Sequence, residues 1–495
     1  MLRASRRNAD RDQLPICHSA TNRPDDKVEF KARCDSLWQS RGTMQSCIQH
    51  CSPAKRVPAK TKPSRNAVSA LRRAKTSSTG TSVHSSITTV LLLASIISPT
   101  MLDATASRFY TTPMTTPPSR PDATPTQRRY HYLDHRPPTG VPERATLLLL
   151  HGFPDFSYGW RNVVAPLKLA GFRLIIPDLL GYGLSSSPPT SAASTAPGTE
   201  SRLAEYGGRA ISIDLNGLLD HARAAQGSEY GAESLTSDGR NGRVIVLCHD
   251  WGSWLGWRFA QWYPERVMGV CGLCVPFQAP TSKYLSIDMV VKNVPNFGYQ
   301  KFFSEERSTK IIEQHLERFL AIIYMIPGLF SADSENDEEI RDWHLLGKLE
   351  KLITMPEFSD IPLKYLGRMI LDGEQLAHYE RIFRSRGMEG PLSWYRTREV
   401  NWQEDRALTS KTLPESLPAL LISPKDDVAV PPAMGRTMLK HVPQTEIIEV
   451  AGSGHWVQNE LPGVVVQHFK EWVERSVLPN EKKGSGMLGW LRSKL

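Results

Sequence analysis

Short apolar runs alternate with helical stretches from Arg129 onward, and this alternation limits the possible fold more than any other feature of the sequence. Each run has the length and the aliphatic or β-branched content of a strand, and helical patterns such as 210–225 and 253–263 lie between the runs. The expected strands are Tyr130–His135, Ala145–Leu150, Arg173–Pro177, Val244–Leu247, Val267–Val275, Ala419–Ser423 and Glu446–Val450. The sequence therefore predicts an α/β fold with a mostly parallel sheet and helices on both faces.

The strand rhythm stops after Phe277 and resumes only at Ala419. The intervening stretch is helical in pattern, and between Ile311 and Ile323, for instance, apolar residues recur at i, i+3 and i+4 spacing. Helices inserted at the carboxyl edge of a parallel sheet lie above the place where such sheets bind ligands. We therefore expect an inserted helical cap. The predicted segments are a first core part at 129–279, a cap at 280–415, a second core part at 416–478 and a tail at 479–495.

The basic charge of the chain is confined to its beginning. Residues 1–130 hold 21 Lys and Arg against 8 Asp and Glu, a net charge of +13, whereas the rest of the chain carries −4. This segment is rich in Ser, Thr and Pro and poor in aromatic residues, so it cannot bury enough apolar surface to offset its ordering entropy. Because it lacks interleaved aromatics and a binding motif, no nucleic-acid partner is expected. Residues 1–128 are predicted to form a disordered extension.

The seven cysteines fall into no metal or disulfide framework. Cys271 and Cys274 form a C-x-x-C pair, but the pair lies inside an apolar run that is expected to be a buried strand. We therefore expect these cysteines to pack in the core without redox chemistry, and the cysteine usage fits a reducing compartment. No metal, flavin or nucleotide motif occurs, so no cofactor is expected.

Two possible targeting signals occur in the sequence. Residues 89–102 are apolar, but the run is too short to cross a bilayer and Pro99 interrupts it. The chain finishes with Ser493, Lys494 and Leu495, the tripeptide that serves as a peroxisomal address. We therefore expect a peroxisomal location, with the import receptor as a partner. A cytoplasmic location, or membrane association through 89–102, is the alternative.

Asp250 stands where a buried strand turns sharply into a helix, in the stretch 244–252 (VIVLCHDWG). Small residues two positions before and after it, Cys248 and Gly252, allow the strained turn that lifts a nucleophile above a sheet. A carboxylate that attacks a saturated carbon leaves an alkyl ester, which water can hydrolyse, whereas a serine would leave an ether and stop after one turnover. Asp250 is therefore a candidate nucleophile for substitution at sp³ carbon. Capping of the following helix is the alternative role.

Two later strands end in residues that complete a catalytic set in the order nucleophile, acid, histidine. The strand at 419–423 runs into Asp426 and Asp427, and the strand at 446–450 is followed by the Gly-flanked His455. His455 would take a proton from the water that attacks the ester, and an acid on its other ring nitrogen would fix its tautomer. From position alone, either Asp426 or Asp427 could be that acid.

Residues 129–475 resemble α/β-hydrolases of the epoxide hydrolase group. The resemblance rests on LLLHGFPDFSYGW at 148–160, PDLLGYGLS at 177–185 and HDWGS at 249–253. It implies the α/β-hydrolase fold with an inserted cap, and an oxyanion hole formed by the backbone N–H groups of Phe153 and Trp251. It also favours Asp426 as the acid, because its distance from the next proline resembles the family's K-D-x-x-x-x-P run.

The same resemblance implies two cap tyrosines that donate hydrogen bonds to the epoxide oxygen as the ring opens. Tyr299 (in YQKFFS) and Tyr395 (in GPLSWYR) match those positions. The leaving alkoxide is very basic, so an acid beside the nucleophile should shield its charge. Without the resemblance, both tyrosines would be read as packing residues of a helical cap. The chain departs from the family pattern at Cys248, where Gly is usual, and at Leu180, where a basic residue is common.

Together these features predict a hydrolase that opens a hydrophobic epoxide to a vicinal diol through an ester on Asp250, with His455 and Asp426 activating water. A haloalkane or haloacid dehalogenase with the same triad is the alternative, although Phe153 stands where many haloalkane dehalogenases carry an amide that holds the halide. A catalytically silent, ligand-binding α/β-hydrolase is the third interpretation. The sequence leaves the substrate and the oligomeric state open.

Overall fold

The structure is a computed structural model, and it describes residues 104–191, 201–230, 242–326, 339–364 and 366–479 of the 495-residue chain. The expectations for residues 1–103, which include the apolar run 89–102, lie outside the described residues. So does the expectation for Ser493–Leu495.

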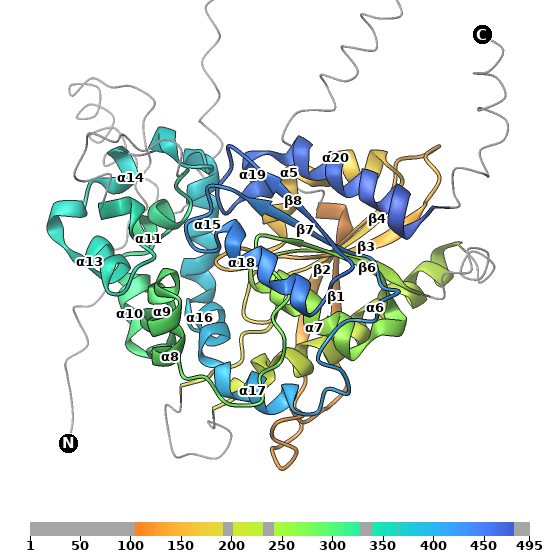
Figure 1. Cartoon of the computed structure of the whole chain (residues 1–495), viewed down its shortest axis with the longest axis horizontal. Coiled ribbons are helices and arrows are strands. Elements are labelled where there is room, and N and C mark those ends of the chain that lie inside the picture. Colours follow the sequence, from red (N-terminus) through yellow and green to blue (C-terminus); the bar gives the residue numbers. More distant parts are fainter. Residues whose placement is uncertain (1–103, 192–200, 231–241, 327–338, 365, 480–495) are drawn as a thin grey trace, which may run out of the picture. The chain divides into compact units, whose positions relative to one another are not determined.

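An eight-stranded sheet runs through the described chain in the order β1-β2-β4-β3-β5-β6-β7-β8 (Figure 1). β2 pairs antiparallel with both β1 and β4, and every further pair is parallel. The strands are β1 (Ser107–Thr111), β2 (Arg129–His135), β3 (Ala145–Leu150), β4 (Phe172–Pro177), β5 (Val244–His249), β6 (Val267–Leu273), β7 (Ala419–Pro424) and β8 (Thr445–Val450). The predicted mostly parallel sheet is confirmed, and its inner strands are buried because helices cover both faces.

The sheet begins before residue 129, so the expectation of a disordered extension is wrong for residues 104–128. β1 pairs antiparallel with β2 and places Phe109 opposite His131. The guanidinium of Arg129 lies over the Phe109 ring at 3.7 Å. The composition of the segment did not indicate this strand. Five residues are stable as a strand only when the edge of an existing sheet pairs with them, and composition does not show that pairing.

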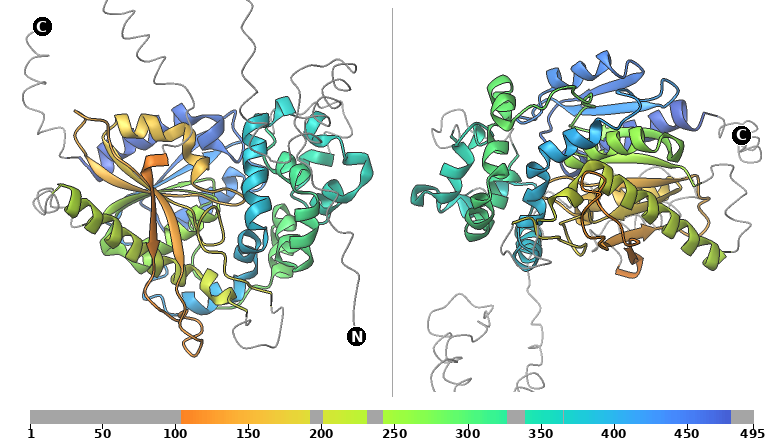
Figure 2. Two further views of the ribbon diagram at one scale, coloured as in Figure 1. Left: turned by 180° about the vertical axis from the view of Figure 1, so that it is seen from behind. Right: turned by 90° about the horizontal axis from the view of Figure 1, so that it is seen from below.

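Helices cover both faces of the sheet, as predicted. α5 and α20 pack together on one face, and α6 and α7 lie on the other (Figures 1 and 2). Each face has its own hydrophobic core: Leu167 and Phe469 belong to the first, Leu215 and Leu255 to the second. The helices outside the cap are α5 (Arg161–Leu169), α6 (Gly208–Tyr230), α7 (Trp251–Trp262), α18 (Pro432–Arg436), α19 (Val457–Glu460) and α20 (Pro462–Trp472).

Short helices form the cap between β6 and β7, on one side of the sheet (Figures 1 and 2). The pattern between Ile311 and Ile323 belongs to two helices, because the backbone leaves the helical conformation at His315 (φ −121°). No helix of the described residues is both long and apolar enough to cross a bilayer. The cap helices are α8 (Ile287–Asn293), α9 (Gly298–Ser304), α10 (Arg307–Gln314), α11 (Leu316–Ile323), α13 (Lys348–Thr354), α14 (Ile361–Lys364), α15 (Gly373–Arg386), α16 (Glu389–Arg396) and α17 (Arg398–Asp405).

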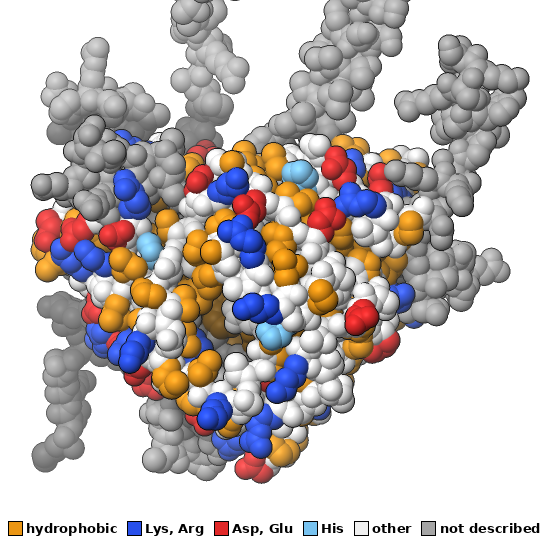
Figure 3. All heavy atoms as spheres, in the orientation of Figure 1, with side chains coloured by type: hydrophobic (Ala, Val, Ile, Leu, Met, Phe, Trp, Pro, Cys, Tyr) orange, Lys and Arg blue, Asp and Glu red, His pale blue; other side chains and the backbone are white. Residues whose placement is uncertain are grey.

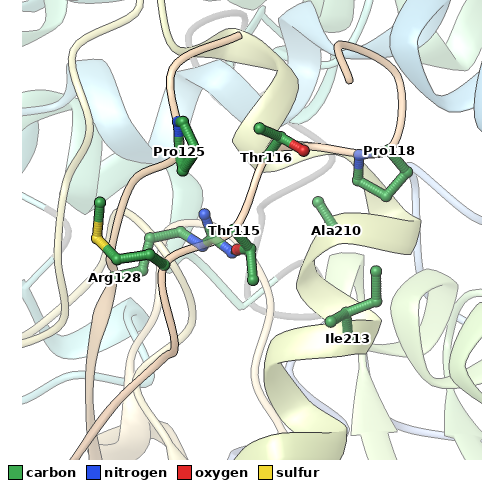
Figure 4. A pocket seen from close by; sticks show the side chains of 8 residues that line it. Thr115, Thr116, Pro118, Pro125, Arg128, Ala210 and Ile213 are labelled. Atoms are coloured by element: carbon green, nitrogen blue, oxygen red, sulfur yellow. The ribbon is translucent and has the colours of Figure 1, made fainter. Parts of the chain in front are cut away.

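A pocket of about 380 Å³ lies between the segment that follows β1 and helix α6 (Figure 4). Arg128 lines this pocket, and its guanidinium donates to the two carboxylate oxygens of Asp214 at 2.6 and 2.7 Å. Tyr130 donates to the same carboxylate at 2.8 Å, and all three side chains are buried. Because the charge of Arg128 is neutralised inside the protein, this arginine serves to hold the β1–β2 connection on α6.

Candidate active site

A sharp turn between β5 and α7 presents Asp250. Its backbone has φ 53° and ψ −122°, a conformation that L-residues rarely adopt, and its side chain makes no capping hydrogen bond to α7. Gly252 permits the turn, since a Cβ there would lie 2.2 Å from the backbone oxygen of Leu150. Cys248 fits at the position where Gly is usual because Gly256 leaves room for its sulfur. The local geometry therefore favours a presented nucleophile over a helix cap.

The loop after β3 supplies one of the two predicted oxyanion donors directly. The backbone N–H of Phe153 donates to Asp250 Oδ1 at 2.8 Å. Gly152 permits this close approach, because a Cβ there would lie 2.4 Å from the Asp250 Cβ. Trp251 is the first residue of α7, directly after Asp250, and its ring lies 5.2 Å from that of Tyr395. An amide that donates to a carboxylate oxygen of Asp250 is placed to stabilise negative charge on that group.

His455 lies between two carboxylates, and the structure corrects the choice of acid. His455 Nδ1 is 2.7 Å from Asp427 Oδ2, and His455 Nε2 is 3.5 Å from Asp250 Oδ2. Asp427 is buried, and its other oxygen accepts the backbone N–H groups of two following residues at 2.9 Å. Asp426 is exposed instead. Asp427 is therefore the acid that contacts the histidine, and Asp426 faces solvent.

The two adjacent acids offer a matched pair of variants. We expect Asp427→Asn to lower kcat roughly 10²- to 10⁴-fold, because the amide cannot stabilise the imidazolium and favours the wrong tautomer. Asp426→Asn should leave kcat within about twofold, since its side chain is exposed. Steady-state kinetics of both variants measures this difference. A large loss in Asp426→Asn together with a mild effect in Asp427→Asn would contradict the assignment.

The charges of the triad set its protonation. Burial raises the pKa of Asp250, but the hydrogen bond and charge of His455 outweigh it, so this pKa lies below its ordinary value. Burial lowers the pKa of His455, but Asp427 and Asp250 outweigh it and raise the pKa to about 10. Asp250 is therefore ionised at neutral pH, which is the form in which a carboxylate can act as a nucleophile. Esterification of Asp250 would remove one of the two negative charges beside His455. The pKa of His455 would then fall, so that its neutral form could act as a base.

Tyr299 on α9 and Tyr395 on α16 lie side by side next to the turn. Their ring centroids are 6.2 Å apart, both side chains are buried, and both line the cavity that contains Asp250. Tyr395 also packs against the ring of Phe153 at 4.9 Å. Burial and the negative charge of Asp250 raise the pKa of both phenols. Each hydroxyl thus keeps its proton at neutral pH and can donate it to a bound oxygen.

Three further residues, which sequence analysis missed, hold the loop that carries His455. His249 Nε2 lies 2.8 Å from the backbone oxygen of His455, and Cys274 Sγ lies 3.0 Å from the same oxygen. Glu460 accepts the backbone N–H groups on either side of His455 at 2.8 and 3.0 Å. The position of His249 next to Asp250 was a possible signal. The C-x-x-C pair marked Cys274 only as a core residue and nothing in the sequence marked Glu460, because their partners are backbone atoms of a distant loop.

His249, Cys274 and His455 also form a group whose potential metal-ligand atoms lie within 4.8 Å of one another. The first two already contact the backbone oxygen of His455, and the ring nitrogens of His455 face Asp427 and Asp250. These contacts engage His249 Nε2, Cys274 Sγ and both ring nitrogens of His455. The group therefore serves to position the histidine.

Asp250 opens into a cavity of about 480 Å³ between the core and the cap. Figure 3 shows a hollow with hydrophobic side chains on this face of the molecule, between the cap helices and α18. Its lining is mainly apolar and aromatic, and its polar and charged residues include Arg258, Gln300, Arg398 and Asp405. An apolar cavity with a few placed polar groups is typical of a site for a small, largely hydrophobic molecule. Its aromatic lining consists of Trp251, Trp254, Tyr284, Phe297, Tyr299, Trp394, Tyr395 and Trp402.

The family model described as "Alpha/beta hydrolase family" matches residues 147–468, a range that contains the turn at Asp250, both adjacent acids and His455. The chain belongs to this family. As an α/β-hydrolase, it has the helical segment inserted between β6 and β7, and the candidate nucleophile Asp250, the candidate acid Asp427 and His455 follow one another in the family's order.

Relatives of this α/β-hydrolase include several epoxide hydrolases. Epoxide hydrolase srdG of Neurospora crassa is 28% identical over 369 residues, which are 70% of this chain and 93% of that protein. Bifunctional epoxide hydrolase 2 of Mus musculus is 29% identical over 333 residues, 67% of this chain and 52% of that protein. The chain thus spans about half the length of the mouse relative.

Solved structures share the fold with this α/β-hydrolase. Epoxide hydrolase A from Mycobacterium thermoresistibile has a TM-score of 0.51 at 24% identity, over 74% of this chain and 98% of that one. An epoxide hydrolase from Vigna radiata has a TM-score of 0.52 at 20% identity, over 75% of this chain and 99% of that one.

Proposed function

We propose that the chain hydrolyses epoxides to vicinal diols through a covalent ester on Asp250. One observation carries the proposal: a carboxylate occupies the nucleophile turn within 3.5 Å of His455, in a cavity that two buried tyrosines also line. An aspartate nucleophile suits attack on saturated carbon. The names of the Neurospora and mouse relatives support an epoxide as the substrate.

In the first step a carboxylate oxygen of Asp250 attacks one ring carbon of the epoxide. The bond between that carbon and the ring oxygen breaks, and the electron pair stays on the oxygen. Tyr299 and Tyr395 donate hydrogen bonds to this oxygen, and one of them supplies the proton that makes it a hydroxyl. The product of the step is a hydroxyalkyl ester of Asp250, and His455 loses a negatively charged neighbour.

In the second step His455, whose pKa has fallen with the loss of the Asp250 charge, has released its resting proton to solvent, and it regains that proton when Asp250 is ionised again. The neutral imidazole takes a proton from water, and the water oxygen attacks the carbonyl carbon of the ester. The Phe153 N–H stabilises the resulting oxyanion. The intermediate collapses by breaking the bond from its carbon to the diol oxygen, which takes the proton from His455. Asp250 then holds one oxygen from water, and its carboxyl proton restores the tyrosine by way of solvent. Asp427 holds the imidazole in the required tautomer throughout.

A single-turnover reaction in oxygen-labelled water tests this mechanism. With enzyme in excess over epoxide, the first diol should carry unlabelled oxygen from Asp250, and label should appear in Asp250 itself, as mass spectrometry of the protein can show. Under multiple turnover, label should enter the diol. Label in the diol from the first turnover would indicate direct attack by water and would refute the ester.

A dehalogenase is the second candidate, because the same nucleophile, acid and histidine can displace a halide. Two tyrosines beside Asp250 favour an epoxide, since an alkoxide requires a proton whereas a halide does not. Phe153 offers no side-chain donor to a halide. Turnover of haloalkanes but not of epoxides by the same preparation would favour the dehalogenase, and binding without turnover of either would favour a silent binding protein.

We also propose, from the sequence alone, that Ser493–Leu495 directs the chain to peroxisomes through the import receptor. The location of a tagged chain with and without these three residues tests it, and an unchanged distribution would refute it.

A further inference from the structure

The cavity that contains Asp250 is lined by two arginines that differ in their partners. Arg258 donates to both carboxylate oxygens of Asp405 at 2.9 Å. Arg398 has no carboxylate partner among the residues that the structure describes, and its guanidinium donates to the amide oxygen of Gln300 at 3.2 Å. Arg398 therefore adds to the cavity wall a positive charge that no described protein group cancels.

Arg398 is half-buried, so its charge is partly withdrawn from water. Arginines that are withdrawn from water are normally paired, as Arg128 is with Asp214 elsewhere in this chain. Burial lowers the pKa of Arg398, and no carboxylate offsets this effect. A guanidinium held in a cavity with unused N–H groups is suited to an anion that arrives with the ligand, because a carboxylate accepts two of these N–H groups at once.

The position of Arg398 limits where such an anion could lie. Gln300 connects it to a catalytic tyrosine, since the Gln300 amide nitrogen donates to the Tyr299 hydroxyl at 3.4 Å while its oxygen accepts from Arg398. The nitrogen and oxygen of one amide are only about 2.3 Å apart, so the Tyr299 hydroxyl and the guanidinium are separated by roughly 9 Å at most. A ligand that contacts both can therefore place its anion no farther from the ring oxygen than this separation plus about one hydrogen-bond length at each end.

We propose that Arg398, positioned by Gln300, recognises a carboxylate on the substrate, so that the preferred substrates are epoxides with an acidic group up to roughly ten carbon atoms from the ring. This inference rests on the proposed function of the site and specifies its substrate class. The apolar walls between Tyr299 and Arg398 hold the connecting chain, and the tyrosines hold the ring oxygen.

Pairs of ω-epoxy acids and their methyl esters test the proposal, because each pair differs only in the charge. At a short spacer the acid should have a kcat/KM about 10- to 100-fold above that of the ester, which corresponds to one charge-assisted contact. The ratio should approach one at long spacers, where the carboxylate extends past Arg398. A ratio near one at every spacer would overturn the proposal.

Substitutions assign the preference to the arginine. Arg398→Gln should bring the acid-to-ester ratio close to one, and Arg398→Lys should keep part of it. Arg384→Gln is the matched control, because this exposed arginine of α15 pairs with Glu380 and does not line the cavity, and the ratio should be unchanged. If Arg398→Gln lowers kcat/KM for the acid and the ester by the same factor, Arg398 acts only on Tyr299 through Gln300, and the anion site is refuted.

A binding measurement separates this inference from the proposed reaction. A saturated carboxylate of the same chain length should bind the wild-type chain at least about tenfold more tightly than it binds Arg398→Gln, as measured by calorimetry. The methyl ester of this acid should bind the wild-type chain at least about tenfold more weakly than the acid does. Such binding would stand even if the chain turned over no epoxide. Equal binding of acid and ester, with epoxides hydrolysed, would refute the anion site and leave the proposed function intact.

Discussion

Replacing Asp250 with alanine is expected to lower kcat by at least about 10⁴-fold, because Asp405, the other described carboxylate that lines the cavity, has both of its oxygens engaged by Arg258. Alanine keeps a Cβ, so the strained backbone at φ 53° is neither relieved nor worsened. The variant loses the acceptor of the Phe153 N–H and one negative charge beside His455. The measurement is diol formation under single-turnover conditions, where wild-type enzyme and variant can be compared at equal substrate occupancy.

Retention of the fold and of ligand binding is the control for Asp250→Ala. The thermal midpoint should stay close to that of the wild type, and a non-hydrolysable ligand should still bind, since the apolar walls of the cavity are untouched. Turnover within tenfold of the wild type would mean that water attacks the epoxide directly, and the assignment of Asp250 as nucleophile would be wrong.

Replacing His455 with glutamine is expected to trap the ester. The first step requires only the carboxylate and the tyrosines, so it should proceed, whereas hydrolysis should slow by roughly 10²- to 10⁴-fold without a base for water. Rapid mixing should then show a burst of about one equivalent of epoxide consumed, followed by slow release of diol. Intact-protein mass spectrometry should show the mass of the chain increased by that of the epoxide.

The double variant Asp250→Ala/His455→Gln is the matched control for the trapped ester, and it should gain no mass. Peptide mapping should place the adduct of the single variant on Asp250. An adduct on Tyr299 or Tyr395, or a single variant that consumes no epoxide at all, would show that the two steps are not divided between Asp250 and His455 as proposed.

The predictable parts of this molecule depend on short stretches of sequence. The strand runs from Ala145 to Val450 and the turn at Asp250 were evident because strand content, helix pattern and small flanking residues are all local. β1 could not be predicted, since its five residues form a strand only against the free edge of β2. Likewise, the pattern from Ile311 to Ile323 did not show the break at His315, where the helical backbone ends.

The choice between adjacent acids is decided by the direction of a side chain. Asp426 and Asp427 both follow β7, and their separation from Pro431 could not distinguish them. In the folded chain Asp427 is buried with one oxygen on His455, and Asp426 faces solvent. The neutralised Arg258 and the unpaired Arg398 differ in the same way, since each lies in the cavity wall but only one meets a carboxylate.

By itself, then, the amino-acid sequence determined the α/β fold class, the inserted cap and a carboxylate presented on a tight turn, because periodicity and turn chemistry act over a few residues. Only the tertiary structure decided which acid serves His455, which groups hold its loop and which arginine is left with a free charge. Those outcomes depend on side-chain direction and on partners that lie far away in the chain, and distances between such groups exist only once the sheet and the cap have packed.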